Sequence, residues 1–260
     1  MSILKRGAFG DSGRRITLEE RLYGNELSYI VITDGTNVRA LAPTRDYKAR
    51  YDGDKGPKTG GMGSYSPAEL NEEEDSEIRR RIVEPTLRGL KKDGIDYSGA
   101  LYFGLMKTSV GFKVIEYNVR LGDPETQTQL FRMRSDLVPY LHSAANGNLA
   151  HLPEIKWDRR KGVSVVVVSP GYPDNTQTIR FAYDFGELGS IPHLGVFYGG
   201  LKEVGTGFEG RGRMLTLSIL GYNFTDANII LYRGFLSRLD FGEWRGDIGL
   251  RPSLVERGRI

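Results

Sequence analysis

The segment from Glu116 to Thr126 has the residue types of a phosphate and metal site. Alternate side chains of a strand share a face, so Glu116, Asn118 and Arg120 are expected to point the same way. Carboxylate and amide oxygens suit Mg²⁺, which keeps waters and phosphates as its other ligands. An arginine beside them can hold a phosphate or a carboxylate with two hydrogen bonds. An ordinary Glu–Arg pair on a solvated sheet is the alternative, but asparagine is depleted in strands, which favours the site.

Residues 52–63 read DGDKGPKTGGMG, a composition that no helix or strand tolerates, so we expect a long loop there. Long loops inside compact domains are usually functional, and the backbone amides of this one can fold over a phosphate. The segment lacks the Gly-Lys-Ser/Thr ending of the P-loop. A surface loop without a ligand explains the same composition equally well.

Acidic residues also stand where an expected strand begins, in the run from Glu19 to Glu26. Carboxylates at a strand end can bind ribose hydroxyls, while exposed backbone groups read an adenine edge. A charged edge strand without a ligand is an equally good interpretation of this run taken alone.

The composition excludes several classes of protein and site. The 260 residues carry 36 Lys and Arg against 33 Asp and Glu, a net charge of +3 that does not indicate a nucleic-acid partner. Cysteine is absent, which excludes disulfides, thiolate metal sites and cysteine nucleophiles. No apolar stretch approaches the ~20 residues of a membrane span, and residues 1–15 do not resemble a signal peptide. We therefore expect a cytoplasmic protein without a membrane partner.

The helices and strands that would position these residues are predicted from the spacing of apolar residues and from the turn residues between them. A helix is expected over 67–92 with Gly94 ending it, and a strand–turn–strand unit over 100–117. The composition and patterning of the chain change near residue 150, so we expect a domain boundary there that divides the chain into 1–150 and 151–260. The other expected elements are a short β-prone run at 16–20, a hairpin of 26–33 and 37–41, helices 136–145 and 225–239, strands 163–169, 180–183, 194–198 and 213–219, and a loop-like tail from 240.

The same segments resemble the glycinamide ribonucleotide synthetases, or phosphoribosylamine–glycine ligases, which are ATP-grasp enzymes. The resemblance rests on DGDKGPKTGGMGSYSPA, preceded by Asp46-Tyr47-Lys48, and on GALYFGLMKTSVGFKVIEYNVRLGDPETQ. LEERLYGNELS resembles the hinge of that family and FGEWRGDIGLR its C-terminal signature. The ordered matches run from about Phe9 to Gly249, which is nearly the whole chain.

The resemblance implies an α+β fold, with a partial ATP-grasp domain in 1–150 and a small β-rich C-terminal domain in 151–260. It implies ligation of glycine to 5-phosphoribosylamine by way of glycyl phosphate in purine biosynthesis, with ATP and Mg²⁺ or Mn²⁺. The site residues that it implies are Arg120 and Asp123 for catalysis, Glu116 and Asn118 for the metal, and Glu19, Glu20, Leu22, Glu26, Lys55, Gly60 and Gly61 for the nucleotide.

The chain departs from the family pattern in two places. The N-terminal α/β domain and the upstream strands with nucleotide-binding lysines do not precede Met1, and Asp174 to Gln177 replace the usual Tyr and Lys-Gly after Pro173. We therefore expect the C-terminal part of a synthetase, active only with a separate N-terminal half. An inactive truncated remnant and a non-catalytic binding subunit are the alternatives.

Overall fold

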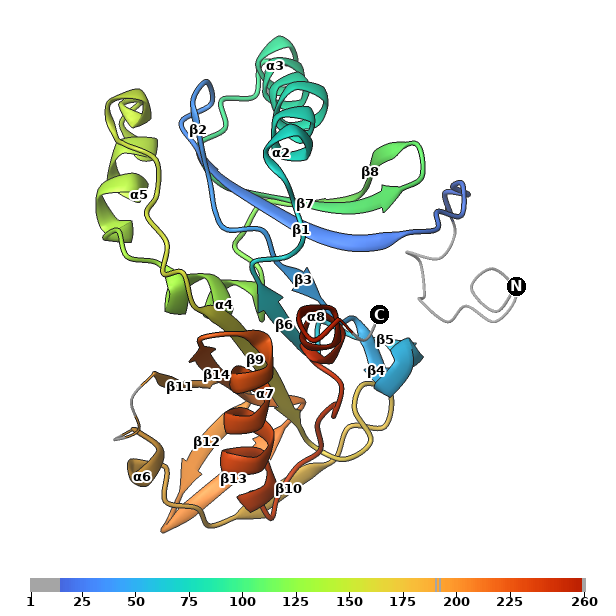
Figure 1. The fold of residues 1–260 in the computed structure, drawn as a ribbon, viewed down its shortest axis with the longest axis vertical. Helices are drawn as coiled ribbons and strands as arrows, with labels where there is room; N and C mark the ends of the chain where they lie inside the picture. The colour runs from blue at the N-terminus through green and yellow to red at the C-terminus, as the bar shows by residue number, and fades with distance from the viewer. Residues whose placement is uncertain (1–14, 190, 192, 259–260) are drawn as a thin grey trace.

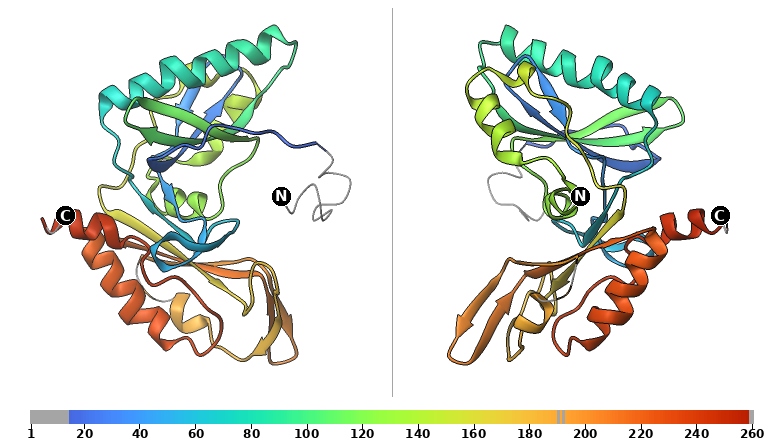
Figure 2. Two further views of the ribbon diagram at one scale, coloured as in Figure 1. Left: turned by 90° about the vertical axis from the view of Figure 1, so that its right-hand side faces the viewer. Right: turned by 60° about the vertical axis from the view of Figure 1, so that its left-hand side comes forward.

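The computed structural model describes residues 15–189, 191 and 193–258. The segment Phe9–Gly13, part of the resemblance above, lies outside them. Helices and sheets alternate irregularly along the chain, and the α+β prediction is confirmed. Figure 1 shows an upper body around strands β1, β7 and β8, and a lower body around β9 and β14. Figure 2 shows the two bodies from other sides.

A four-stranded antiparallel sheet forms the upper body, with the strand order β2-β1-β7-β8. Its strands include the expected hairpin and the expected strand–turn–strand unit, and both predictions are confirmed. The strands are β1 (Asn25–Thr33), β2 (Val38–Ala40), β7 (Gly99–Thr108) and β8 (Gly111–Asn118).

One face of this sheet is covered by a continuous helical rod (Figure 1). The rod consists of α2 (Glu72–Ile78), a π-helical turn η3 (Arg79–Val83) and α3 (Glu84–Lys92). It begins at Asn71 rather than at 67, because the Asn71 side chain and Glu74 cap each other's backbone N–H groups. The widened turn precedes Pro85, which has no N–H to donate.

Among the residues that the structure describes, those that cover the other face of the sheet lie at one end. Ile30 and Ile32 of β1 pack there against Tyr140 and Ala144 of α5 (Leu137–Ala145). The opposite end of β1 presents the polar residues Glu26 and Ser28, which line a cavity. Side chains that alternate along β1 therefore place one end of this face in the hydrophobic core and the other end at the cavity.

A five-stranded sheet with the order β11-β14-β9-β6-β3 joins the two bodies. It combines strands from both sides of residue 150, so the two expected segments share one sheet, and the boundary itself stays a prediction. The expected strands at 163–169, 194–198 and 213–219 are confirmed. The members are β3 (Arg45–Asp46), β6 (Gly63–Ser66), β9 (Lys161–Val168), β11 (Leu194–Tyr198) and β14 (Arg213–Gly221).

Helices cover both faces of this sheet. The valines at 163, 165 and 167 of β9 pack toward α7 (Phe224–Asn228), which continues as η5 (Ile229–Phe235) and η6 (Leu236–Arg238) and confirms the expected helix 225–239. The serines at 64, 164 and 218 face α4 (Glu125–Arg132), where Thr128 Oγ1 lies 2.5 Å from Ser64 and 2.6 Å from Ser164. The sequence of α4 carries no apolar stripe that would predict a helix.

Three expectations are wrong. The β-prone run 16–20 is not a strand, because its residues are exposed and pair with no neighbouring strand. Residues 52–63 are partly regular, because β4 and β5 form a hairpin around the turn η2. The tail from 240 ends in a helix, α8. The remaining elements are β4 (Ala49–Tyr51), η2 (Asp52–Asp54), β5 (Lys55–Lys58), η4 (Leu149–His151), β10 (Thr178–Phe181), α6 (Gly186–Gly189), β12 (Leu201–Val204), β13 (Gly207–Arg211) and α8 (Leu250–Glu256).

The three strands β10, β13 and β12 form a separate sheet at the base of the lower body. No helix in the described part of the chain has the length and apolar character that crossing a membrane takes.

Candidate active site

A cavity of about 440 Å³ lies between the open end of the four-stranded sheet and the β3–β6 region. Strands β1, β7 and β8 contribute its walls, and the rest comes from Asp46 and Lys48, from residues 58–60 and from Arg120. Four of the predicted site residues line it, namely Glu26, Gly60, Glu116 and Arg120. The cavity therefore brings together residues up to 94 positions apart along the chain.

Of the three residues predicted at the end of β8, Glu116 and Arg120 line the cavity and Asn118 does not. Glu116 stands opposite Gly104 on β7, where an added Cβ would lie 2.8 Å from the Glu116 side chain. Arg120 follows the end of the strand, and its Nη2 donates to Asn118 Oδ1 at 3.3 Å. Glu116 and Arg120 thus face one space, with Asn118 bonded to the arginine.

Lys48 is the central cation of the cavity. Its Nζ lies 3.2 Å from Asp46 Oδ2 and 3.5 Å from Glu116 Oε1. Burial alone would lower the pKa of Lys48, but the carboxylates of Asp46, Glu125 and Glu116 raise it. The ammonium group is therefore held charged where phosphate oxygens or a carboxylate could meet it.

Two buried carboxyl groups lie in this region: Asp46 lines the cavity, and Glu125 contacts two of its lining residues. Glu125 accepts hydrogen bonds from Ser28 Oγ at 2.8 Å and from Tyr102 Oη at 2.9 Å. Burial and the neighbouring Glu125 raise the pKa of Asp46 well above its usual range, while Lys48 opposes the shift. Two acids with such different partners are typical of functional sites.

The glycine-rich segment packs closely against Asp46. Gly61 has φ +121°, and an added Cβ would lie 2.6 Å from Pro124 Cδ and 2.9 Å from Asp46 Oδ1. Only glycine permits that backbone angle and that close approach. The neighbouring Gly60 lines the cavity itself.

Arg213 of β14 ties this loop to the turn before α4. Its Nη1 donates to Gly60 O at 3.1 Å and to Asp123 O at 2.7 Å, and its Nη2 lies 3.0 Å from Asp123 Oδ2. Asp123 also accepts from Gln127 Nε2 at 2.8 Å and does not line the cavity. The predicted catalytic Asp123 thus holds the loop in place rather than facing the open space.

Other predicted nucleotide residues lie away from the cavity. Glu19 and Glu20 are exposed and Leu22 is half-buried, and none of them is among its lining residues. Lys55 is exposed at the start of β5, whereas Lys58 from the same strand does line the cavity.

The C-terminal tail is anchored by Arg245 as well as by Phe241, which is buried in the core and stacks on Phe181. Arg245 is fully buried, donates to Ala49 O at 3.0 Å and Asp54 Oδ1 at 2.9 Å, and forms a two-bond pair with Asp247. Its guanidinium also lies 4.8 Å from the centre of the Tyr47 ring. The tail therefore fixes the β4–β5 hairpin that leads into the glycine-rich segment.

The site also involves four residues for which the sequence predicts no role, namely Asp46, Lys48, Glu125 and Arg213. The alternating charges of Asp46 and Lys48 around Tyr47 were a usable signal, because a strand would place both charges on one face. No local signal marks Glu125 or Arg213, whose partners lie far away in the sequence.

The donor set fits a divalent metal that takes most of its ligands from a nucleotide. Glu116 offers a carboxylate and Asn118 an amide oxygen, which are ligands that Mg²⁺ and Mn²⁺ accept. Within the described residues no three His, Cys, Asp or Glu side chains are grouped to hold a metal ion. Phosphate and water oxygens would have to complete the coordination.

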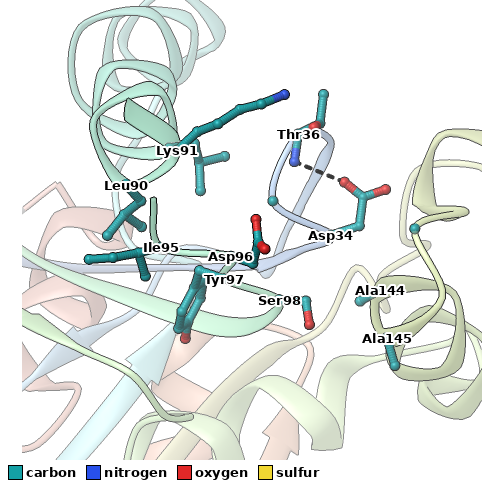
Figure 3. Close-up of a pocket in the computed structure, with 13 residues that line it drawn as sticks. Asp34, Thr36, Leu90, Lys91, Ile95, Asp96, Tyr97, Ser98, Ala144 and Ala145 are labelled. Atoms are coloured by element: carbon teal, nitrogen blue, oxygen red, sulfur yellow. Dashed lines mark hydrogen bonds between the residues drawn. The ribbon is translucent and has the colours of Figure 1, made fainter. Parts of the chain in front are cut away.

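A second cavity of about 300 Å³ lies at the other end of the upper body (Figure 3). The end of α3, the β1–β2 turn and the end of α5 line it, with Leu90, Asp96 and Ala144 among them. Asp34 there accepts from the Thr36 backbone N–H at 3.0 Å and so serves its own turn. None of the predicted site residues lies in this cavity.

Residues 1–126 match the family model described as phosphoribosylglycinamide synthetase, ATP-grasp (A) domain. The chain is 40% identical to phosphoribosylamine–glycine ligase of Allochromatium vinosum over 98% of its own length and 60% of that protein. It is 39% identical to the ligase of the same name from Caulobacter vibrioides, over 94% of its length and 58% of that protein. The chain thus spans about 60% of the length of these relatives.

The structure is similar to a crystal structure of phosphoribosylamine–glycine ligase from Thermotoga maritima. The TM-score is 0.76 at 30% identity, and the match covers 88% of this chain and 56% of that one. A biotin carboxylase domain of a 2-oxoglutarate carboxylase matches with a TM-score of 0.60 at 15% identity, over 85% of this chain and 47% of that one, and shows the fold alone. The prediction of a partial ATP-grasp fold is confirmed, and the chain is similar over nearly its whole length to part of the phosphoribosylamine–glycine ligases.

Proposed function

We propose that this chain carries the nucleotide-phosphate and acyl-activation site of an ATP-dependent ligase that joins glycine to 5-phosphoribosylamine in purine biosynthesis. The observation that carries the proposal is the single cavity in which Lys48, Glu116 and Arg120 converge beside the glycine-rich segment. Two cationic side chains, a carboxylate that can bind a metal and the nearby backbone of the glycine-rich segment suit phosphoryl transfer. In that reaction, positioning and charge neutralisation supply most of the catalysis. A reaction that consumes ATP fits the cytoplasm, which is the location we propose.

In the first step, a carboxylate oxygen of glycine attacks the γ-phosphorus of ATP, the bond to the β–γ bridging oxygen breaks, and glycyl phosphate and ADP form. Glu116 and Asn118 would hold Mg²⁺ or Mn²⁺, which neutralises phosphate charge when bound. We propose that Arg120 and Lys48, which both line the cavity, bind the transferring phosphoryl group and the carboxylate.

In the second step, the amine of phosphoribosylamine attacks the glycyl carbon. The C–N bond forms, the bond from carbon to the phosphate oxygen breaks, phosphate leaves, and the amine loses a proton. The acyl phosphate must be kept from water meanwhile. We propose that the segment around Gly60 and Gly61 provides this cover, held by Arg213 and Asp123.

For the nucleotide, we propose contacts from Glu19, Glu20, Leu22, Glu26 and Lys55, as the resemblance implies. Glu26 is the one that lines the cavity, where its Oε1 lies 3.4 Å from Lys58 Nζ. The others stand outside the cavity, so their contact with the nucleotide requires that the nucleotide extend beyond this cavity toward residues 19–22.

Because the chain spans about 60% of its relatives, we propose that turnover needs the remainder of the family's length, supplied as a separate half or by fusion. The test measures phosphate release that depends on both glycine and phosphoribosylamine, with and without that half from a relative. Turnover in the reconstituted preparation, and its loss in the chain alone, is the expected result. Binding of Mg²⁺–ATP without turnover after reconstitution would favour a non-catalytic binding subunit or an inactive remnant.

A further inference from the structure

The glycine-rich segment has four consecutive backbone N–H groups, at residues 59–62, and each has a partner within the protein. The two outer groups donate to backbone oxygens, Lys48 O at 2.7 Å and Tyr47 O at 2.8 Å. The two inner groups, those of Gly60 and Gly61, donate to side-chain hydroxyls at 3.3 Å and 3.0 Å. A bond to a hydroxyl can break without loss of the backbone pairing, so these two N–H groups are the ones that a ligand could take over.

Of these two glycines, Gly60 lines the cavity of the candidate site and Gly61 does not. The hydroxyl that accepts from Gly60 belongs to Tyr172, which is not among the residues that line the cavity. This bond therefore holds the Gly60 N–H on a group outside the cavity. Glycine has no side chain to obstruct a rotation of the peptide, so the N–H can turn once the bond is broken.

Tyr172 is fixed through its ring and its backbone. The ring packs against a buried cluster that includes Val166 and Val168 of β9. The backbone oxygen accepts from Arg50 Nε at 3.0 Å, and the side chain of Arg50 is 4% exposed and paired with Glu243 of the tail. Because the tyrosine is held in place, the glycine-rich segment is the part that moves when the bond breaks.

The turn that presents Tyr172 includes residues 174–177, which depart from the pattern of the phosphoribosylamine–glycine ligases. The Asn175 N–H donates to Gly171 O at 2.8 Å and folds the turn back on itself. Gly171 has φ +76°, and an added Cβ would lie 2.1 Å from Asn175 O, so this position requires glycine. The departing residues thus support the turn that carries the tyrosine.

We propose that Tyr172 is a positioning residue whose hydroxyl competes with a nucleotide phosphate oxygen for the Gly60 N–H. The inference rests on the proposed function, because it needs a nucleotide phosphate in that cavity. A charged phosphate oxygen accepts a hydrogen bond about twice as strong as a neutral hydroxyl does, and the cations Lys48 and Arg120 line the same cavity. An entering phosphate therefore draws the N–H away from the tyrosine, while Arg213 keeps its bond to the Gly60 oxygen.

The test compares Mg²⁺–ATP binding to the 260-residue chain and to Tyr172→Phe, which removes the hydroxyl and keeps the ring. The variant should bind Mg²⁺–ATP about 5-fold more tightly, the factor that corresponds to one net hydrogen bond of ~1 kcal/mol. A residue that only supported the site would give weaker binding when its hydroxyl is removed. The matched control is Tyr198→Phe on β11, at a residue that is 58% exposed and lies outside the cavity, and it should bind as wild type does.

Amide hydrogen exchange reports on the bond itself. Without nucleotide, Gly60 should exchange roughly 5-fold faster in Tyr172→Phe than in wild type, because its acceptor is lost. Thr59 and Met62, which donate to backbone oxygens, should exchange equally in the two proteins. With saturating Mg²⁺–ATP, Gly60 should exchange at the same slow rate in both, because the phosphate then holds the N–H. The unfolding temperature without nucleotide should be the same in the two proteins.

Three results would overturn the inference while leaving the proposed function intact. They are unchanged or weaker Mg²⁺–ATP binding in Tyr172→Phe, equal exchange at Gly60 in the two proteins without nucleotide, and a clearly lower unfolding temperature of the variant, which would identify a structural hydroxyl. Failure of the wild-type chain to bind Mg²⁺–ATP would count against the proposed function itself.

Discussion

Glu116 links the metal and the phosphates at the scale of single residues. Its carboxylate lines the cavity, and its Oε1 lies 3.5 Å from Lys48 Nζ. Glu116→Ala should lower metal-dependent turnover of the reconstituted enzyme by about 10²-fold or more, because a charge-stabilising group at the phosphates is lost. The measurement is phosphate release against Mg²⁺ concentration.

The matched control for this substitution is Glu203→Ala, an exposed carboxylate on β12. It should leave turnover unchanged. Wild-type turnover and wild-type metal dependence in Glu116→Ala would remove Glu116 from the site.

Arg213 supports a second prediction, which needs no catalysis. Its guanidinium joins Gly60 and Asp123 through three contacts, a geometry that lysine cannot reproduce. Arg213→Lys should speed amide hydrogen exchange in residues 59–62 by roughly 10-fold, since one or two net hydrogen bonds of ~1 kcal/mol each are lost.

Exchange in the helical rod should stay the same in Arg213→Lys, which makes residues 72–92 an internal control. The exposed Arg180→Lys on β10 is a control for the substitution itself. Equal exchange at 59–62 in both variants would show that Arg213 does not hold the loop.

The sequence predicts residues of the site where the reason is local. Glu116, Asn118 and Arg120 follow from strand alternation, and the structure places the first and last in one cavity. Glu125 could not be identified, because its burial depends on Ser28, 97 positions earlier in the chain. Long-range packing, rather than residue type, brings that carboxylate to the lining residues Ser28 and Tyr102.

At the scale of elements, the start of the helical rod yields a stability prediction. Asn71 accepts from the Glu74 backbone N–H at 2.8 Å, and the Glu74 side chain accepts from the Asn71 N–H at 3.2 Å. Asn71→Ala should lower the free energy of unfolding by about 1 kcal/mol, the usual value of an N-cap. Urea unfolding checks this value, and Asn71→Ser, which keeps the cap, should lose only a few tenths of that amount.

Elements with a strong local pattern were predictable and those shaped by tertiary contacts were not. The run of β9 and the helix 224–238 have clear apolar patterns, and both predictions are confirmed. Helix α4 was missed because its buried residues include Thr128, Gln129 and Arg132, which carry no apolar stripe. Their burial depends on hydrogen bonds to distant strands and loops.

The β4–β5 hairpin is the opposite case, because it is regular where the composition predicts a loop. Glycine and proline suggested an irregular loop from 52 to 63, yet Gly53 at φ +69° forms the turn and residues 55–58 pair with β4. Asp54 and Asp52 are held by Arg245 and the Gly246 N–H of the tail. A contact from nearly 200 positions away therefore stabilises a strand that its own composition disfavours.

At the scale of the whole molecule, stability should depend on pH through Asp158. Two-point contacts from Arg160, with Arg134 nearby, hold the pKa of this buried carboxyl group well below its usual range. A carboxyl group with a lowered pKa in the folded state stabilises the fold above its unfolded pKa of about 3.9, and that contribution disappears as the pH falls.

Asp158→Asn should therefore reduce stability at pH 6 and flatten its decline between pH 5 and 2. Urea unfolding across that range measures the difference, with Asp96→Asn as the exposed control. Parallel curves for Asp158→Asn and wild type would show that this carboxyl group does not contribute to the pH dependence.

The edge of the upper body should make the molecule self-associate. Strand β8 is the last strand of its sheet, and Tyr117 and Val119 near its end are 51% and 74% exposed. An open sheet edge with neighbouring exposed apolar side chains favours pairing with another chain. Sedimentation should show association that rises with concentration and decreases in Val119→Glu, because a charge at the edge opposes pairing.

The control is Val138→Glu, at a residue of α5 that is 67% exposed and lies away from the edge. This variant should associate as wild type does. A monomer at all concentrations, or equal effects of both substitutions, would show that this edge does not drive association.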